Sequence, residues 1–378
     1  MTEFIDPTPN NPVHAARLLS FLDLTAVLAV LEGFYCESWR HRHPPEAMLR
    51  LVALYKLKRF RFLTELWKVL DDETLRLLGF RWKPSYKTVW HWLNVRLGPE
   101  GLETVHSALM KATKEALEVQ GVSLGLKVAG DASPIQAMSR DKEAKYNGYY
   151  KKVCYLVHRL VCSATNLTLS WAVTLGNVDE ACMMVVLLMK ALLLGVMPKE
   201  AGFDNGYASP SNYALLGLTT MKPLIGFRKN AKPNWRGKPK TLKLRYRKMV
   251  KAGVLKADRL IALGLNPNPD ENGIDEILSG LTIAGQHEYV GAYYRNVSLS
   301  EFCQDGKSWL KIYVSMRNAI EGSNGHQKDW LDLDNLRVKG LRKAMSHTAL
   351  SMLTEAMVAY TRVQNGVLKG LTSLAYLK

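Results

Sequence analysis

The sequence predicts a mixed α/β protein, with a mixed sheet flanked by helices and an all-helical region before it. Residues 14–120 carry apolar side chains at helical spacing, whereas residues 121–224 alternate short apolar runs, typical of strands, with helical segments. A basic stretch then interrupts this pattern, which resumes afterwards. We therefore expect a helical region (1–120), a first core part (121–224), an insertion (225–308) and a second core part (309–378).

Composition favours a polyanionic partner. The chain has 378 residues, enough for two or three domains, and its 51 Lys and Arg against 34 Asp and Glu give a formal net charge of +17. Such an excess favours nucleic acid first and a membrane surface second. The most basic stretch begins with much proline and glycine, which argues against a membrane-binding amphipathic helix.

Cysteine usage and hydropathy predict a cytoplasmic protein. The five cysteines include no CxxC pair, which argues for a reducing compartment and against a disulfide framework or a zinc site. The polar N-terminus lacks the apolar core of a signal peptide. The most apolar run, residues 181–198, is short for a membrane span and contains Lys190, so we expect a buried helix there.

The N-terminal region is expected to be helical, with helix ends near Gly79 and Gly98. One interpretation is a helix-turn-helix in which residues 85–96 read DNA. The outward cations would then be Lys87, His91 and Arg96. The other interpretation, equally open, is a plain helical bundle with Trp90 and Trp92 in its core.

The first core part predicts three strands, a helix, a strand, a helix and a strand. The expected strands are 123–131, 153–164, 167–176, 199–204 and 221–227, and the expected helices are 179–194 and 210–219. Thr165 and Asn166 suggest a short turn between the second and third strands. After the insertion, residues 309–316 look strand-like again, and a long amphipathic helix begins near residue 338.

The most basic block, residues 227–260, is a candidate DNA-binding surface. Trp235 and Tyr246 are interleaved with its cations, an arrangement that suits tracking of a phosphate backbone. The cations that we expect to touch DNA are Lys238, Lys240, Lys243 and Arg245. The alternative is a solvated charged face.

One helical stripe combines an acid, two cations and a tyrosine. Tyr313, Arg317 and Glu321 are four residues apart, and Lys328 follows seven residues later, so all four share one face of a helix. A surface Arg–Glu pair alone would contribute about 0.2–0.5 kcal/mol. That interpretation does not account for Gly322 and Gly325, which follow Glu321 closely in the sequence.

Three acids occupy positions from which they could converge. Asp131 is expected at the end of the first strand, Asp204 at the end of the fourth, and Glu321 on a helix. Each acid alone is more easily explained as a turn or surface residue. Together they could meet at one edge of a mixed sheet, where packed carboxylates repel one another unless hard divalent cations lie between them.

These motifs resemble those of DDE-type transposases of bacterial insertion sequences. Tyr313-x3-Arg317-x3-Glu321-x6-Lys328 looks like the Tyr-Arg-Glu-Lys signature of one large group of these enzymes, and FDNGYAS resembles the group's second-acid motif. Residues 44–93 are similar to the group's helical N-terminal region. The resemblance covers roughly residues 44–365.

The resemblance implies an RNase H-like catalytic core and Mg²⁺-dependent cleavage and transfer of DNA strands. Asp131, Asp204 and Glu321 would be the catalytic metal ligands for two Mg²⁺ ions, with Mn²⁺ expected to substitute and with Asp131 bridging both ions. Arg317 and Lys328 would hold DNA phosphates, and Tyr313 would donate to a phosphate or stack on a base.

The implied partner is double-stranded DNA, namely transposon terminal inverted repeats and target DNA, bound by a homodimer. The implied location is the nucleoid of a bacterium or archaeon. Two alternatives stay open: an RNase H-like nuclease or resolvase that cleaves without strand transfer, and a domesticated, non-catalytic DNA-binding protein. The sequence contains no Walker A, GxGxxG or HExxH motif for other enzyme classes.

Overall fold

The computed structural model describes residues 12–35, 43–226, 294–295, 297–299, 301–302 and 304–374. The predicted DNA contacts Lys238, Lys240, Lys243 and Arg245 lie outside these residues.

The N-terminal region is helical, as predicted. Its elements are α1 (Val13–Ser20), α2 (Thr25–Glu32), α4 (Pro45–Leu57), α5 (Leu63–Val69), α6 (Asp72–Leu78), α7 (Tyr86–His91), the π-helical turn η1 (Trp92–Leu97) and α8 (Gly98–Val119). Polar caps explain where the short helices begin, because Asp71 accepts a hydrogen bond from the Thr74 amide and Ser85 accepts one from the Thr88 amide. Gly79 ends α6 with a φ of 96°, as expected for a left-handed cap.

Gly98 also marks a helix end, as predicted, because it is the C-cap residue of η1 and has a φ of 59°. The next helix, α8, begins at this same residue. Trp90 and Trp92 support different interpretations of this region. Trp92 is fully buried, as a helical bundle requires, whereas the side chain of Trp90 is 45% exposed.

The described residues form one six-stranded mixed sheet. Its strands are β1 (Lys127–Gln136), β2 (Lys145–Asn147), β3 (Lys152–Cys162), β4 (Thr168–Leu175), β5 (Glu200–Phe203) and β6 (Lys222–Ile225). β2 and β4 pair with one side of β3, and β1 pairs with the other side, all antiparallel. β5 and β6 then continue the sheet parallel to β1, so the predicted mixed sheet is confirmed.

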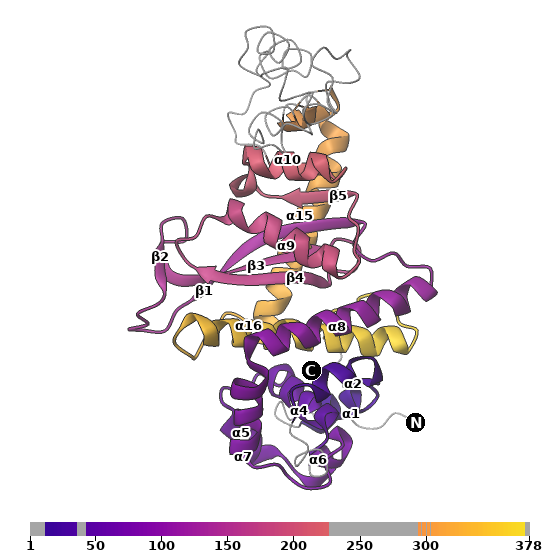
Figure 1. Ribbon diagram of the computed structural model, residues 1–378, viewed down its shortest axis with the longest axis vertical. Helices are drawn as coiled ribbons and strands as arrows, with labels where there is room; N and C mark the ends of the chain where they lie inside the picture. The colour runs from indigo at the N-terminus through magenta and orange to yellow at the C-terminus, as the bar shows by residue number, and fades with distance from the viewer. Residues whose placement is uncertain are drawn as a thin grey trace, which may run out of the picture.

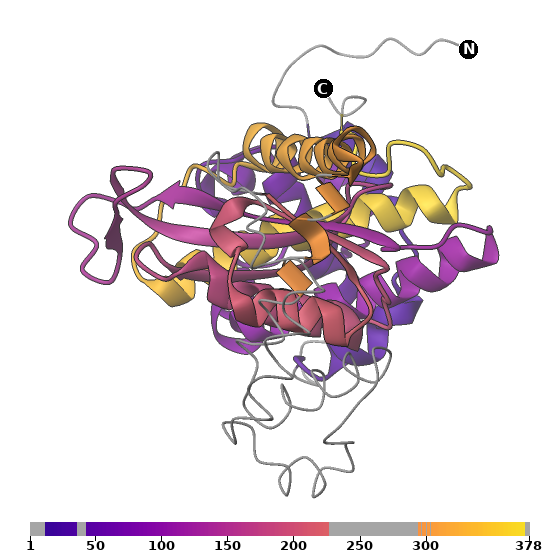
Figure 2. The ribbon, with the colours of Figure 1, turned by 90° about the horizontal axis from the view of Figure 1, so that it is seen from above.

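Helices cover both faces of the sheet. They are the 3-10 turn η2 (Glu180–Cys182), α9 (Met183–Leu193), the 3-10 turn η3 (Asn205–Tyr207), α10 (Pro210–Leu218), α15 (Gly306–Leu331) and α16 (Leu341–Gln364). α15 lies on one face, and α9 and α10 lie on the other (Figure 2). α8 and α16 pack side by side between the sheet and the remaining N-terminal helices (Figure 1).

A small apolar cluster seats α15 on the sheet. Ala129, Val161 and Leu224 from three strands pack against side chains of α15, namely Trp309, Met316 and Ile320. The helix can approach closely at Gly202, where a Cβ atom would lie only 3.1 Å from Met316. This apolar contact determines which side of α15 faces the strands.

The prediction of a strand at 309–316 was wrong, because these residues belong to α15. Trp309, Met316 and Ile320 recur at helical rather than strand spacing against the sheet. The Asp305 side chain caps the helix by accepting a hydrogen bond from the Ser308 amide. Burial of that face and the cap therefore outweigh the local alternation of apolar and polar residues.

Asp131 lies in the middle of β1 rather than at its end, which corrects a second prediction. Ser133 and Pro134 had suggested a turn, but both continue to pair with β3. β5 ends at Phe203, beside Gly130, so beyond this point β1 is paired only on its β3 side. A strand with one unpaired side tolerates a proline, which has no amide proton to donate.

Among the described residues, no single helix is both long and apolar enough to cross a membrane. The helices α1 and α2 meet the length and composition test only as a pair, and a bend of 99° separates them.

Candidate functional site

The strand register brings two of the three predicted acids together. β1 and β5 run parallel, with Gly130 beside Phe203 as their last pair. The next residue of each segment is an aspartate, Asp131 in β1 and Asp204 directly after β5. Asp204 also caps η3, because its Oδ1 accepts a hydrogen bond from the Gly206 amide at 2.8 Å.

Arg317 of α15 links the third acid to this pair. Its Nη1 lies 3.3 Å from Oδ1 of Asp131, and its Nη2 donates a hydrogen bond of 3.1 Å to Oε1 of Glu321. The Asp131 and Arg317 side chains are only 15% and 19% exposed, whereas the Glu321 side chain is 60% exposed. Arg317 thus connects Glu321 to Asp131, and the Glu321 carboxylate is turned mostly to solvent.

Burial and charge repulsion both act on Asp131. Removal of its carboxyl group from water raises its pKa, the nearby Arg317 guanidinium lowers it, and the Asp204 carboxylate raises it again. The net result is a pKa above the usual aspartate range. The site therefore disfavours full ionisation unless more positive charge enters it.

A fourth acid, Glu180 in η2, was not predicted. Its pKa rises from 4.5 to about 7, chiefly because of burial and then because of Asp204 and Asp131. A Cβ atom at Gly206 would lie 3.0 Å from both Glu180 Oε2 and Asp204 Oδ1, so these two carboxylates flank the same glycine. The sequence feature that could have pointed to Glu180 is its place in the pair Asp179-Glu180, at the start of the helix that follows the third long strand.

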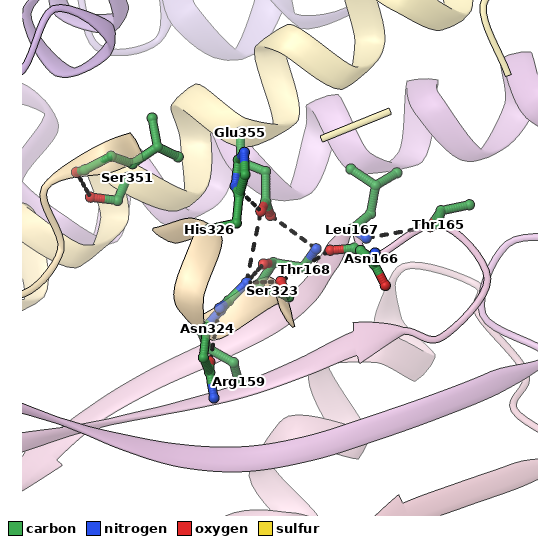
Figure 3. Close-up of polar contacts among 11 residues, drawn as sticks. Arg159, Thr165, Asn166, Leu167, Thr168, Ser323, Asn324, His326, Ser351 and Glu355 are labelled. Atoms are coloured by element: carbon green, nitrogen blue, oxygen red, sulfur yellow. Dashed lines mark hydrogen bonds and ion pairs between the residues drawn. The ribbon is translucent and has the colours of Figure 1, made fainter. Parts of the chain in front are cut away.

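A buried polar network surrounds Arg159 (Figure 3) and connects to Asp131 through Asn324. Asn324 of α15 donates from Nδ2 to Oδ2 of Asp131 at 3.2 Å, and its Oδ1 accepts from Nη1 of Arg159 at 2.9 Å. Arg159 lies opposite Asp131 in the β1–β3 register and is fully buried. It also donates to the hydroxyl of Ser323 at 2.7 Å.

Glu355 of α16 balances the charge of Arg159. The two side chains are almost completely buried, and Nη2 of Arg159 lies 3.8 Å from Oε1 of Glu355. Glu355 also accepts a hydrogen bond from the Thr168 amide of β4 at 3.1 Å. The network thus joins β1, β3, β4, α15 and α16 around one buried cation.

The sequence did carry a signal for this network. Arg159 interrupts the otherwise apolar run of β3, and Glu355 interrupts the apolar face of the long C-terminal helix. A charge inside an apolar strand requires a buried partner, since an unpaired buried charge is costly. Which residue is that partner depended on how α16 packs against the sheet.

The other two residues of the helical stripe already have partners. Lys328 Nζ lies 3.6 Å from Oδ2 of Asp334. The ring of Tyr313 stacks on Trp309, with ring centroids 5.0 Å apart, and burial raises the pKa of its hydroxyl. Gly322 and Gly325 face open space, with no atom within 4 Å of a Cβ built on either.

Lys87 and Arg96, the predicted DNA contacts of the N-terminal region, are both exposed. They lie on α7 and η1, in the helical region on the far side of α8 and α16 from the sheet (Figure 1). The structure therefore does not bring them to the carboxylates.

The donor chemistry of the site fits a hard divalent cation. Asp131, Asp204, Glu180 and Glu321 offer only carboxylate oxygens, which Mg²⁺ and Mn²⁺ prefer. The pKa values of Asp131 and Glu180 are raised first by burial and then by neighbouring carboxylates. In the part of the chain that the structure describes, no three acidic, histidine or cysteine side chains form a ready metal-binding group. Arg317 instead lies between Asp131 and Glu321.

No protein-family model matches the chain, and neither a search of curated proteins nor a search of solved structures gives a match.

Proposed function

We propose that this protein is a DNA transposase that cleaves and joins DNA strands through a Mg²⁺-dependent carboxylate site. The observation that carries the proposal is the adjacency of Asp131 and Asp204 across two parallel strands, with Arg317 linking them to Glu321. Those four residues belong to the motifs that resemble DDE transposases. Asp131 and Asp204 are thus neighbours, and Arg317 lies between Asp131 and Glu321.

The sheet topology supports an RNase H-like core. Three antiparallel strands, β4, β3 and β1, are followed in space by β5 and β6 parallel to β1. A long helix, α9, separates β4 from β5 in sequence, and another, α10, separates β5 from β6. In this arrangement the central strand and its parallel neighbour carry the first two acids.

Asp131, Asp204 and Glu321 would hold the cations, and Glu180 adds a fourth carboxylate beside Asp204. Bound divalent cations would supply activation of the attacking hydroxyl group and stabilisation of the leaving oxygen at a phosphodiester. The chain itself orients these carboxylates, since Asn324 and Arg317 hold the two oxygens of Asp131 from α15.

Arg317 and Lys328 are suited to position the DNA backbone. Arg317 is partly buried beside the acids, and its planar guanidinium could exchange Glu321 for a phosphate, to which it can bind through two nitrogens. Lys328 lies two helical turns after Glu321 and would act as a point charge. The open space at Gly322 and Gly325 leaves room for DNA along this side of α15.

The test uses a plasmid that carries the gene together with its own flanking genomic DNA. We expect the purified protein to nick or excise this DNA with Mg²⁺ and to join the released 3′ ends to a second plasmid, whereas Asp204→Ala should bind DNA without cleaving it. Cleavage without joining would favour the nuclease alternative. DNA binding without cleavage by the wild-type protein would favour the non-catalytic alternative.

A further inference from the structure

The connection between β1 and β3, residues 137–151, carries exposed cations and aromatic rings. We call this connection the arm. It includes β2 and projects from the sheet at the end opposite the α8 C-terminus (Figures 1 and 2). The side chains of Tyr149 and Tyr146 are 85% and 59% exposed. The exposed cations are Arg140, Lys142, Lys145 and Lys151.

Both acids of the arm are hydrogen-bonded to the rest of the fold, although Glu143 stays exposed, and the four exposed cations outnumber them. Asp141 Oδ2 accepts hydrogen bonds from the Tyr155 hydroxyl at 2.9 Å and from the Gly340 amide at 3.0 Å. Glu143 Oε2 accepts one from the Leu341 amide at 2.8 Å, at the start of α16. Both carboxylates thus anchor the arm to the fold and leave the lysines and tyrosines facing solvent.

Hydrogen bonds within the arm fix its backbone. Asn147 Oδ1 accepts from the amides of Tyr149 and Tyr150, each at 2.9 Å, and Asn147 Nδ2 donates to the Gly176 carbonyl at 2.6 Å. The two tyrosine rings meet edge to face with centroids 4.9 Å apart. A partner would therefore meet a preformed surface and would not have to order it.

The base of the arm adjoins the carboxylate site. The Tyr150 hydroxyl donates to the carbonyl of Ala132, the residue after Asp131, at 3.1 Å. On the α15 side, Asp334 pairs with Lys328 and also interacts electrostatically with Lys152, the residue that follows the arm. Asp334 is therefore influenced by one cation of the α15 stripe and by one at the end of the arm.

We propose that the arm is a DNA-binding surface, in which Lys145 and Lys151 contact phosphates and Tyr149 stacks on an unpaired base next to the cleaved bond. This inference rests on the proposed function, because that function makes DNA the substrate at the adjoining site. Interleaved cations and aromatic rings suit a phosphate backbone with accessible bases.

The first experiment measures binding of the full-length protein to random-sequence duplex DNA by fluorescence anisotropy at several salt concentrations. Divalent cations are omitted, so the measurement does not depend on cleavage. The Lys145→Glu/Lys151→Glu variant should bind at least about tenfold more weakly, and its slope of log K against log salt should shrink by about 1.8, that is, about 0.9 per lost phosphate contact.

The matched control is Lys111→Glu/Lys199→Glu, which makes the same charge change at two other exposed lysines. Lys199 directly precedes β5, at the opposite end of that strand from Asp204. Affinity and salt slope in this control should stay close to those of the wild type, and thermal melting of all variants should be unchanged. A control that weakens binding as much as the arm variant would overturn the assignment, because only net charge would then matter.

The second experiment tests stacking with a duplex that ends in a single-stranded overhang. Tyr149→Ala should weaken binding about tenfold, whereas Tyr149→Phe, which keeps the ring, should bind like the wild type. Equal binding by all three proteins removes stacking from the proposal.

The outcomes separate the arm from the proposed function. If the wild type binds DNA and the arm variant binds equally with the same salt slope, the arm proposal fails and the proposed function stands. If the wild type does not bind DNA, both fail. Loss of binding to anionic lipid vesicles in the arm variant, with DNA binding unchanged, would assign the arm to a membrane surface and overturn the proposal.

Discussion

Asn324 of α15 donates a hydrogen bond to Asp131 of β1 at 3.2 Å, while its own carbonyl oxygen accepts one from the buried Arg159. The orientation of the Asp131 carboxylate therefore depends on a side chain that is itself held by a buried cation. Arg159 is held in turn by Ser323 and Glu355. This relationship makes Asn324 a positioning residue for the proposed site.

Asn324→Ala is expected to slow DNA cleavage while DNA affinity stays near that of the wild type. The change removes the link between Arg159 and Asp131 but leaves the Arg159–Glu355 ion pair intact. Loss of a hydrogen-bond partner that orients a metal ligand typically lowers metal affinity or activity by about 10–100-fold. Single-turnover cleavage of pre-bound DNA and the Mg²⁺ concentration for half-maximal rate should both shift.

The matched control is Asn318→Ala, an exposed position on the same helix. It should cleave DNA at the wild-type rate. If Asn324→Ala lowers only the melting temperature, and the rate at a permissive temperature matches that of the control, the link has a structural role alone.

Arg317→Ala should leave the fold intact and reduce the rate of the chemical step by about 10²–10³-fold. Arg317 is the cation that contacts both Asp131 and Glu321, so its loss would remove the proposed phosphate-binding group and leave these carboxylates uncompensated. Arg317→Lys should restore only part of the rate, since a point charge cannot reproduce a two-pronged contact. The control is Lys311→Ala, at an exposed position of α15. If Arg317→Ala cleaves DNA at the wild-type rate, the contacts of Arg317 with the acids are only ion pairs without a catalytic role.

Glu180 should make metal-free stability fall as pH rises. Its pKa is 4.5 in an ordinary environment and about 7 in the fold, so between these pH values the native state binds a proton that the unfolded chain lacks. Stability attributed to Glu180 is therefore present below about pH 4.5 and lost as pH rises through about 7. Glu180→Gln should flatten this decline in chemical denaturation.

Mg²⁺ provides an independent readout for Glu180. At pH 8, Mg²⁺ should raise the melting temperature of the wild type more than that of Glu180→Gln, because the variant offers one carboxylate fewer. Glu115→Gln, on an exposed part of α8, should behave like the wild type. An equal effect of Mg²⁺ on all three proteins would place Glu180 outside the cation site.

Lys56 should have the opposite effect on stability. It is 3% exposed in α4, near Nδ1 of His347 at 3.5 Å, and burial lowers its pKa from 10.5 to about 7. The unfolded chain therefore binds a proton that the native state lacks between about pH 7 and 10.5, so stability rises with pH over this window.

Lys56→Met should raise the free energy of unfolding at pH 7 by about 1–4 kcal/mol, since it replaces a buried charge with an apolar side chain of similar length. The gain should shrink toward pH 10. Urea denaturation at several pH values measures it, with exposed Lys68→Met as the control. If Lys56→Met keeps the pH dependence of the wild type, that dependence comes from other titratable groups.

Local sequence patterns were sufficient for most helices and strands. The turn at Asn166, which adopts a φ of 60°, the strand that ends before Asp204 and the long helix α16 all follow from apolar periodicity and turn chemistry. The spacing of Tyr313, Arg317 and Glu321 likewise depends only on helical geometry. These features involve residues within a few turns of one another, where local preferences decide.

The errors arose where distant burial overrode a local signal. Residues 309–316 look like a strand in isolation, but Trp309 and Met316 bury the helical face that meets the sheet. Ser133 and Pro134 signal a turn, yet pairing with β3 continues through both of them. In each case an element far away in sequence supplied the stabilising contacts.

The sequence by itself determined the helical stripe of α15, the order of the five strands β1, β3, β4, β5 and β6 with the helices between them, and the choice of Asp131, Asp204 and Glu321 as candidate ligands. Only the tertiary structure decided that Glu180 accompanies Asp204 and that Arg159 pairs with Glu355. The physical reason is that charge partners are chosen by distance and burial. Distance and burial are fixed only when α15 and α16 pack on the sheet, so no spacing pattern in the sequence reports them.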